Sequence, residues 1–381
     1  MLLSRHTTRR VRVGQIEIGG GAPISVQSMC STPTTQIDAA VRQAEALREA
    51  GASLVRFSVD TSRDVEALAE IRRSTTVALV ADLQENYRLA ASVAPHVHKI
   101  RYNPGHLQHH EKGKGTAEKV AHLAAVARVH DLAIRVGVNA GSLDPRAGER
   151  FPDRREAMVE SALEHAKILD GQGFERYVVS LKCSDPAQTV EANLDFAARR
   201  PDVPLHIGVT EAGLPPDGIW KTRIAVEQLL ARGVGDTVRV SLTLPAGRKA
   251  DEVLAGQEIL ADIEAGRFRS VPPRLGRLRV VSCPACGRVE SERFVDLAMR
   301  VREMAVDLGD LDLTIAVMGC RVNGPGETDG ADLGLWCGPA TVHLKRGSRA
   351  IGTFGYDEIL ARVREELDAR ARHGAEVQAR E

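Results

Sequence analysis

Short apolar runs alternate with longer amphipathic stretches along the first 270 residues. The runs predict eight β-strands, near residues 24–28, 53–57, 77–81, 97–102, 133–138, 176–181, 204–209 and 236–242. The stretches between them predict helices, for example over 38–50, 117–130, 156–171 and 190–200. Eight strand–helix units in about 250 residues predict a (β/α)8 TIM barrel. A doubly wound open sheet is the alternative.

The pattern changes after residue 267, where Pro272 and Pro273 predict a linker. Beyond it we expect a smaller α/β domain. Its predicted elements are a strand at 278–282, a helix at 290–307, a strand at 312–318, short strands at 333–336, 341–345 and 349–353, and a last helix from residue 357. We therefore divide the chain into a substrate-binding barrel, residues 1–270, and a second domain, residues 271–381.

Cationic side chains recur near the ends of the predicted barrel strands. They are Arg56, Arg101, Arg135, Lys182 and Arg239. The carboxyl ends of barrel strands meet at one mouth, where these cations would repel one another. A phosphate or diphosphate ligand would remove that repulsion, and arginine binds phosphate in a bidentate manner. The alternative is that each cation pairs with a local carboxylate.

Neutral hydrogen-bonding residues accompany the cations at the same strand ends. They are Asn103, Asn139, Ser184, Thr210 and Ser241. Glu211, which follows the seventh strand, is the acidic exception. Its carboxylate could transfer a proton during a reaction. It could equally be the counter-ion of one arginine.

Three cysteines of the second domain have the spacing of metal ligands. Cys283 and Cys286 form a Cys-x-x-Cys turn, and Cys320 follows in a glycine-flanked segment. The segment 324–326, Gly-Pro-Gly, predicts a sharp turn that could bring the Glu327 carboxylate to the same centre. Three thiolates and one carboxylate favour an iron–sulfur cluster with one unusual iron, and thus a redox enzyme. A structural zinc site, completed by Cys337, is the alternative.

Composition gives no support for nucleic acid or a membrane as a partner. The 51 basic and 51 acidic residues give a net charge of zero, and aromatic residues make up only 3%. Neither feature favours nucleic acid or an anionic membrane as a partner. No apolar stretch approaches the length of a membrane span, and no signal peptide is visible. Six cysteines in a chain of 381 residues do not suggest a disulfide framework, so we expect a reducing, cytoplasmic location.

Several motifs occur in order along the chain: residues 23–29 (PISVQSM), 99–105 (KIRYNPG), 135–143 (RVGVNAGSL), 206–213 (HIGVTEAG), 235–243 (GDTVRVSLT), 282–288 (SCPACGR) and 318–327 (MGCRVNGPGE). Together they resemble the motifs of the bacterial 4-hydroxy-3-methylbut-2-enyl diphosphate synthase family. The resemblance implies a TIM barrel followed by an iron–sulfur domain similar to those of sulfite and nitrite reductases. It implies a homodimer in which the second domain of one subunit caps the barrel of the other. A flavodoxin or ferredoxin would donate the electrons.

The resemblance also implies the reaction, a two-electron reductive ring opening and dehydration of 2-C-methyl-D-erythritol 2,4-cyclodiphosphate in isoprenoid biosynthesis. A 4Fe-4S cluster would be held by Cys283, Cys286, Cys320 and Glu327, with Glu211 and Glu327 as the catalytic carboxylates. The residues expected to bind substrate are Arg56, Arg101, Asn103, Arg135, Asn139, Lys182, Ser184, His206, Thr210, Arg239 and Ser241.

One position departs from the family pattern. Gln84 stands where many members carry histidine, so an imidazole contact to substrate would become an uncharged amide. Two other functions remain open at this stage. One is a non-redox aldolase that uses Lys182 as a Schiff base beside a structural zinc. The other is an iron sensor without turnover.

Overall fold

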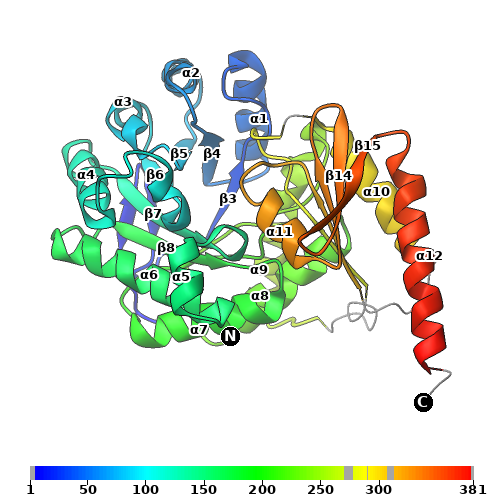
Figure 1. Cartoon of the computed structure of the whole chain (residues 1–381). Coiled ribbons are helices and arrows are strands. Elements are labelled where there is room, and N and C mark those ends of the chain that lie inside the picture. Colours follow the sequence, from blue (N-terminus) through cyan, green and yellow to red (C-terminus); the bar gives the residue numbers. More distant parts are fainter. Residues whose placement is uncertain (1–4, 270–277, 290, 307–312, 379–381) are drawn as a thin grey trace.

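The computed structural model describes residues 5–269, 278–289, 291–306 and 313–378. Eight parallel strands form the first domain, in the order β8-β7-β6-β5-β4-β3-β10-β9. A bridge between Val179 and Leu205, with a 3.0 Å bond from Val179 N to Pro204 O, joins β8 to the start of β9. This contact nearly closes the sheet into a barrel ringed by helices (Figure 1). The TIM-barrel prediction is confirmed, and the open sheet is excluded.

Each predicted run of the barrel overlaps one strand. The strands are β3 (Ser25–Met29), β4 (Leu54–Ser58), β5 (Ala78–Gln84), β6 (Lys99–Tyr102), β7 (Ala133–Asn139), β8 (Tyr177–Lys182), β9 (His206–Ile207) and β10 (Thr237–Val238). The last two strands are shorter than predicted. Gly208 follows β9 with a φ of +137°, so the chain leaves the extended conformation early.

Helices follow the strands and cover the outside of the barrel. They are α1 (Ile37–Glu49), α2 (Ser62–Ser74), α3 (Ala90–Val93), α4 (Thr116–Val129), α5 (Pro145–Arg150), α6 (Arg154–Gly171), α7 (Pro186–Arg199), α8 (Asp217–Leu230) and α9 (Ala250–Glu264). Short 3₁₀ helices η1 (Tyr87–Leu89), η2 (Ala94–His96), η3 (Pro104–His109), η4 (Ala140–Ser142) and η5 (Ala246–Arg248) lie in the loops. Helix α1 buries Ala40, Ala44 and Leu47, the spacing of one helical face.

A hairpin of β1 (Val11–Val13) and β2 (Ile16–Ile18) was not predicted. Val11, Val13 and Ile18 are fully buried and join a cluster with residues near the amino ends of the barrel strands. The hairpin therefore fills the end of the barrel opposite the mouth. Strict alternation around Gly14, whose φ is +62°, is the signal that would have found it.

The second domain is a five-stranded mixed sheet in the order β11-β12-β13-β14-β15. Its strands are β11 (Leu278–Ser282), β12 (Leu313–Met318), β13 (Leu333–Cys337), β14 (Thr341–Arg346) and β15 (Arg349–Gly355). Its helices are α10 (Arg293–Val306), α11 (Gly324–Gly330) and α12 (Ile359–Gln378). Figure 1 shows α11 on the side facing the barrel and α10 and α12 on the far side.

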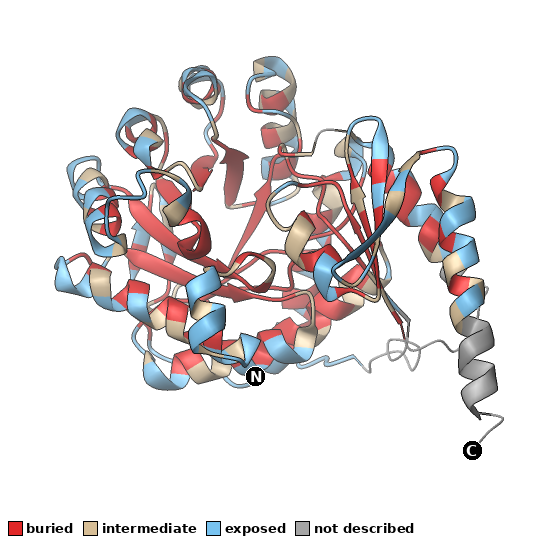
Figure 2. Cartoon of the chain, viewed as in Figure 1, coloured by how far each residue is buried: buried red, intermediate tan, exposed pale blue. Residues whose placement is uncertain are grey.

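Each domain has its own apolar core, and Figure 2 shows buried residues along the strands of both domains. The predicted linker prolines and the boundary at residue 270 lie outside the described residues. Among the described residues, no helix has the length and apolar character needed to cross a membrane.

Candidate active site

One pocket lies at the carboxyl ends of the barrel strands, beneath the second domain. The barrel contributes Met29, Arg56, Asp82, Gln84, Arg101, Arg135, Val138, Asn139, Lys182, Thr210, Glu211, Arg239 and Ser241. The second domain contributes Cys283, Pro284, Cys286, Arg288, Cys320, Val322 and Asn323. Six of these side chains are cationic and two are carboxylates, so the pocket is built for an anion.

Several guanidinium nitrogens in the pocket lack a hydrogen-bond partner. Among the residues described, Nε of Arg101, Nη1 of Arg135, and Nε and Nη2 of Arg239 are buried without one. Arg135 Nε donates to Ser180 Oγ at 3.1 Å, which fixes the side chain and leaves its outer nitrogen free. Because buried donors are normally paired, these atoms indicate an acceptor-rich ligand.

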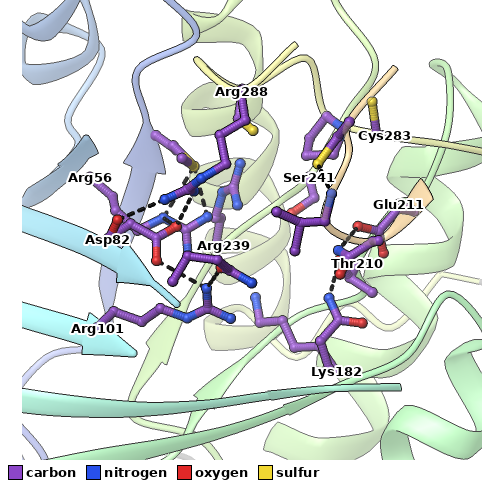
Figure 3. Close-up of a pocket in the computed structure, with 18 of the residues that line it drawn as sticks. Arg56, Asp82, Arg101, Lys182, Thr210, Glu211, Arg239, Ser241, Cys283 and Arg288 are labelled. Atoms are coloured by element: carbon purple, nitrogen blue, oxygen red, sulfur yellow. Dashed lines mark hydrogen bonds and ion pairs between the residues drawn. The ribbon is translucent and has the colours of Figure 1, made fainter. Parts of the chain in front are cut away.

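Asp82 is the main counter-ion of the barrel cations. Its Oδ1 accepts a bond from Arg101 Nη1 at 2.9 Å, and its Oδ2 lies 3.6 Å from Arg56 Nε. Arg288 of the second domain donates to the same carboxylate through Nη1 at 2.9 Å. Figure 3 shows these arginines and Arg239 around Asp82 on one side of the pocket, with Cys283 and Glu211 on the other.

Asp82 does not fully neutralise the cations of the pocket. Burial, with the Arg135, Arg239 and Arg56 charges, holds the pKa of Lys182 well below its usual value. Burial and the neighbouring Arg56 and Arg101 likewise lower the pKa of Arg135. Burial also lowers the pKa of Arg56 to about 9 despite the Asp82 carboxylate. A bound anion would reverse these shifts, since an opposite charge favours the protonated form.

Glu211 faces the pocket from the segment after β9. It is 2% exposed, and its backbone φ is +45°, a conformation that residues other than glycine rarely adopt. Its Oε1 accepts a 2.6 Å hydrogen bond from Nδ2 of Asn323, which belongs to the second domain. Its Oε2 is buried without a partner among the described residues. Burial raises the pKa of the carboxyl, while bonds from Thr210 and Asn323 lower it.

The three predicted thiol ligands come together at the same pocket. Cys283, Cys286 and Cys320 are all buried, and two backbone amides donate to their sulfurs. Gly319 N lies 3.3 Å from Cys283 Sγ, and Val322 N lies 3.3 Å from Cys320 Sγ. Amide bonds to sulfur are a feature of iron–sulfur sites, where they tune the potential.

The spacing of the thiols also bears on the choice between zinc and a cluster. Within the described ranges, the one group whose ligand atoms all lie within 4.8 Å of one another is Glu85, His106 and His109. The three thiols therefore do not all lie that close together, although the Cys286 and Cys320 thiols interact with each other. A multi-iron cluster holds its thiolates farther apart than one tetrahedral zinc does, so the donor set fits a cluster.

Glu327 is buried and lies close enough to Glu211 for the two charges to interact, but it does not line the pocket. It belongs to α11, which begins at Gly324 with Pro325 in its first turn, so the predicted sharp turn is wrong. Proline is well suited to this place because the first amides of a helix make no hydrogen bond within the helix, so its missing N–H costs nothing there. Ser184 Oγ donates to Glu327 Oε2 at 3.1 Å, and Glu327 Oε1 is buried without a partner within the described residues. Because buried carboxylate oxygens are normally paired, this unpaired oxygen is free to act as a ligand.

Most predicted substrate residues lie in the pocket, but three do not line it. Asn103 caps η3 by accepting from Gly105 N at 3.1 Å, and Ser184 is engaged with Glu327. His206 is fully buried. Burial, with the charges of Arg135 and the barrel lysines, holds its pKa well below the usual value.

Sequence reasoning missed three polar residues of the pocket, Asp82, Arg288 and Asn323. Asp82 shares its strand face with Val80 and Gln84, so strand parity could have found it. The other two lie beside predicted cysteine ligands.

Together, the barrel, its cationic mouth and the buried thiols define a TIM-barrel enzyme that binds a multiply charged anion next to a metal-ligand set. Comparison with known proteins makes this assignment specific. Residues 8–257 match the GcpE TIM-barrel domain, and residues 279–369 match the GcpE protein C-terminal domain. The chain belongs to the GcpE family, as its sequence motifs predicted.

Among the relatives that are similar along nearly the whole chain are two that are named 4-hydroxy-3-methylbut-2-en-1-yl diphosphate synthase (flavodoxin). The protein from Rhodopirellula baltica is 58% identical over 371 residues, covering 97% of each chain. The protein from Aquifex aeolicus is 39% identical over 377 residues, covering 98% of this chain and 99% of its own.

Proposed function

We propose that this enzyme converts 2-C-methyl-D-erythritol 2,4-cyclodiphosphate to 4-hydroxy-3-methylbut-2-enyl diphosphate by a two-electron reductive ring opening and dehydration. The reaction belongs to isoprenoid biosynthesis. The observation that carries the proposal is the pocket in which unpaired nitrogens of Arg101, Arg135 and Arg239 lie together with three buried thiols. That arrangement supports binding of a diphosphate next to an electron source. The names of the relatives support the same reaction.

Substrate binding uses the guanidinium donors that have no protein partner. Arg135 and Arg239 each present at least one unpaired nitrogen to the pocket, and Lys182 adds a third cationic charge near both of them. Diphosphate oxygens accept such bonds in a bidentate manner and neutralise the mutual repulsion of the cations. Asn139 Nδ2 donates to Thr210 Oγ1 at 3.2 Å, which fixes two neutral groups beside the cations.

A 4Fe-4S cluster held by Cys283, Cys286, Cys320 and Glu327 completes the site. When bound, the cluster supplies the two electrons one at a time. Glu211 holds the proton for the leaving hydroxyl group, which departs as water. The 2.6 Å bond from Asn323 Nδ2 to Glu211 Oε1 leaves Oε2 as the oxygen free to donate. The second domain covers the mouth and excludes bulk water from the reacting groups.

The family resemblance supports a proposal for the assembly and the electron supply. We propose a barrel over residues 1–270, a cluster domain over 271–381, a homodimer and a cytoplasmic location. In this structure the second domain docks on the barrel of its own chain, with Ala212 bridged to Ser282 and Lys249 Nζ donating to Pro284 O at 2.6 Å. In a dimer the same contacts would join one subunit to the other. Flavodoxin, which the relatives' names specify, or a ferredoxin would donate the electrons.

An anaerobic assay tests the proposal. The holoenzyme is mixed with dithionite-reduced viologen and the cyclic diphosphate, and 4-hydroxy-3-methylbut-2-enyl diphosphate is followed by chromatography. We expect viologen oxidation and product formation at two electrons per product. A purified holoenzyme that binds the cyclic diphosphate without oxidising viologen would contradict the proposal.

A further inference from the structure

A second group of metal-ligand side chains lies at the rim of the barrel mouth. Glu85 Oε2 is 2.7 Å from His109 Nδ1 and 3.9 Å from His106 Nδ1. The two imidazole rings stack with their centroids 4.6 Å apart. One ligand atom from each residue lies within 4.8 Å of the others, a separation that a single ion can bridge.

The local sequence explains why these side chains meet. His106 and His109 are three residues apart on the 3₁₀ helix η3, where side chains at i and i+3 eclipse each other. Gln84, the last residue of β5, has a φ of +50°, so the chain turns there and Glu85 leaves the strand. Strands β5 and β6 are neighbours in the barrel, and the segments that follow them therefore lie side by side.

We propose that Glu85, His106 and His109 bind one divalent transition metal ion of the zinc class, through two imidazole nitrogens and one carboxylate oxygen. Two histidines and a glutamate form a common zinc-binding set that leaves a fourth position open to water. The ion would replace the proton that now links Glu85 to His109.

The protonation states suit metal binding. Burial lowers the pKa of His106 to about 4, so its ring is neutral at physiological pH and keeps a lone pair for the ion. Burial alone would raise the pKa of Glu85, but the His109 hydrogen bond and the nearby Arg321 lower it, so the carboxylate is charged. Arg101 and Arg288 also lie near His106 and would repel a dication. We therefore expect weaker binding than at a structural zinc site.

The rim site is connected to the substrate pocket by Gln84. Its Nε2 lies 3.4 Å from His106 Nδ1, and its side chain lines the pocket. An ion bound at His106 Nδ1 takes the lone pair that accepts from Gln84, which frees the amide group to donate to a ligand in the pocket. This consequence depends on the proposed function, whereas metal binding at the rim does not.

Zinc X-ray absorption tests the site in the holoenzyme. With one equivalent of Zn²⁺ added, we expect a shell of nitrogen and oxygen ligands with imidazole scattering and no sulfur. By calorimetry, Glu85→Gln and His109→Ala should each weaken zinc binding roughly tenfold or more, because each removes one of three ligands. The exposed His130, at the end of α4, provides the control His130→Ala, which should bind zinc like the unchanged protein.

A sulfur shell around zinc, or equal zinc binding by the His109→Ala and His130→Ala variants, would overturn the site. The connection through Gln84 has a separate measurement. Zinc should change the KM for the cyclic diphosphate in the unchanged protein but not in His109→Ala. If zinc binds as expected and no turnover occurs, the proposed function fails while the rim site stands.

Discussion

Arg288 forms four hydrogen bonds across the interface between the two domains, and its removal gives a quantitative prediction. It donates to Asp82 Oδ2 at 2.9 Å and to Asp82 O at 2.7 Å. It also donates twice to Asp60 Oδ1, at 3.1 and 3.0 Å. The side chain is only 4% exposed. Removing one partner of such a buried, hydrogen-bonded ion pair costs about 3–5 kcal/mol.

The lower end of that range applies, because Asp82 keeps its 2.9 Å bond to Arg101 in an Arg288→Ala variant. A loss of about 3 kcal/mol corresponds to about 100-fold in the docking equilibrium. Arg302→Ala is the matched control. Its 2.8 Å pair with Asp217 also joins the domains, but the two side chains are 29% and 46% exposed. Such a pair contributes at most about 1 kcal/mol, or about fivefold.

Hydrogen–deuterium exchange measures both effects at the same amides. Amides at the barrel mouth that exchange only when the domains separate should lose about 100-fold of their protection in Arg288→Ala and fivefold or less in Arg302→Ala. The readout is independent of cluster chemistry and of whether the docked domains belong to one chain or two. Equal loss of protection in the two variants would show that Arg288 does not control docking.

Three further substitutions give distinct outcomes. Glu211→Gln should lower kcat by about 10²–10⁴-fold with little change in KM, because it removes a proton donor and leaves the cations in place; a large rise in KM instead would make Glu211 a binding residue. Cys320→Ser should abolish the brown absorbance of the reconstituted protein while its circular dichroism stays unchanged; a full iron content would exclude this ligand. His165 is buried beside Tyr102, and burial lowers its pKa to about 4. The free energy of unfolding of the protein should therefore decrease as pH falls from about 6.5 towards 4. Urea unfolding measures the free energy of unfolding at pH 7.5 and at pH 5. The decrease between these two pH values should be about 2 kcal/mol smaller in His165→Asn than in the unchanged protein, and an equal decrease in both proteins would contradict a buried neutral imidazole.

Strand parity explains why much of the pocket could be predicted. In β7, Ile134, Val136 and Val138 alternate with Arg135, Gly137 and Asn139, so the polar set had to face the barrel interior. The carboxyl ends of parallel strands meet at one mouth, and this brought Arg56, Arg239 and Lys182 together without further information. The spacing of the cysteines likewise predicted that the three thiols, which come from two separate loops, would meet.

Strand parity predicts which face of the sheet a side chain points to. It does not predict how deep in the barrel the side chain lies or which other group binds it, and the remaining errors follow from this. His206 has the expected orientation, yet it lies below the mouth among buried cations. Asn103 also follows its strand in the expected register, but the backbone amide of Gly105 captures its oxygen as a cap. Arg288 and Asn323 bind residues of the other domain. They could not be predicted, because the local pattern of a sequence does not indicate which surfaces of two domains will dock.

Docking completes the pocket in two places, and it does so through the two carboxylates. Asn323 binds one oxygen of Glu211, and Arg288 binds one oxygen of Asp82. Arg288 thereby takes a share of the counter-charge that Asp82 provides to Arg56 and Arg101, so the barrel cations become less neutralised when the second domain arrives. A diphosphate in the mouth supplies the missing negative charge. Anion binding and domain docking must then strengthen each other by the same factor, since coupling between two binding equilibria is reciprocal. Without the docked domain, the mouth would bind substrate with lower affinity. Without substrate, the mouth would bind the second domain with lower affinity.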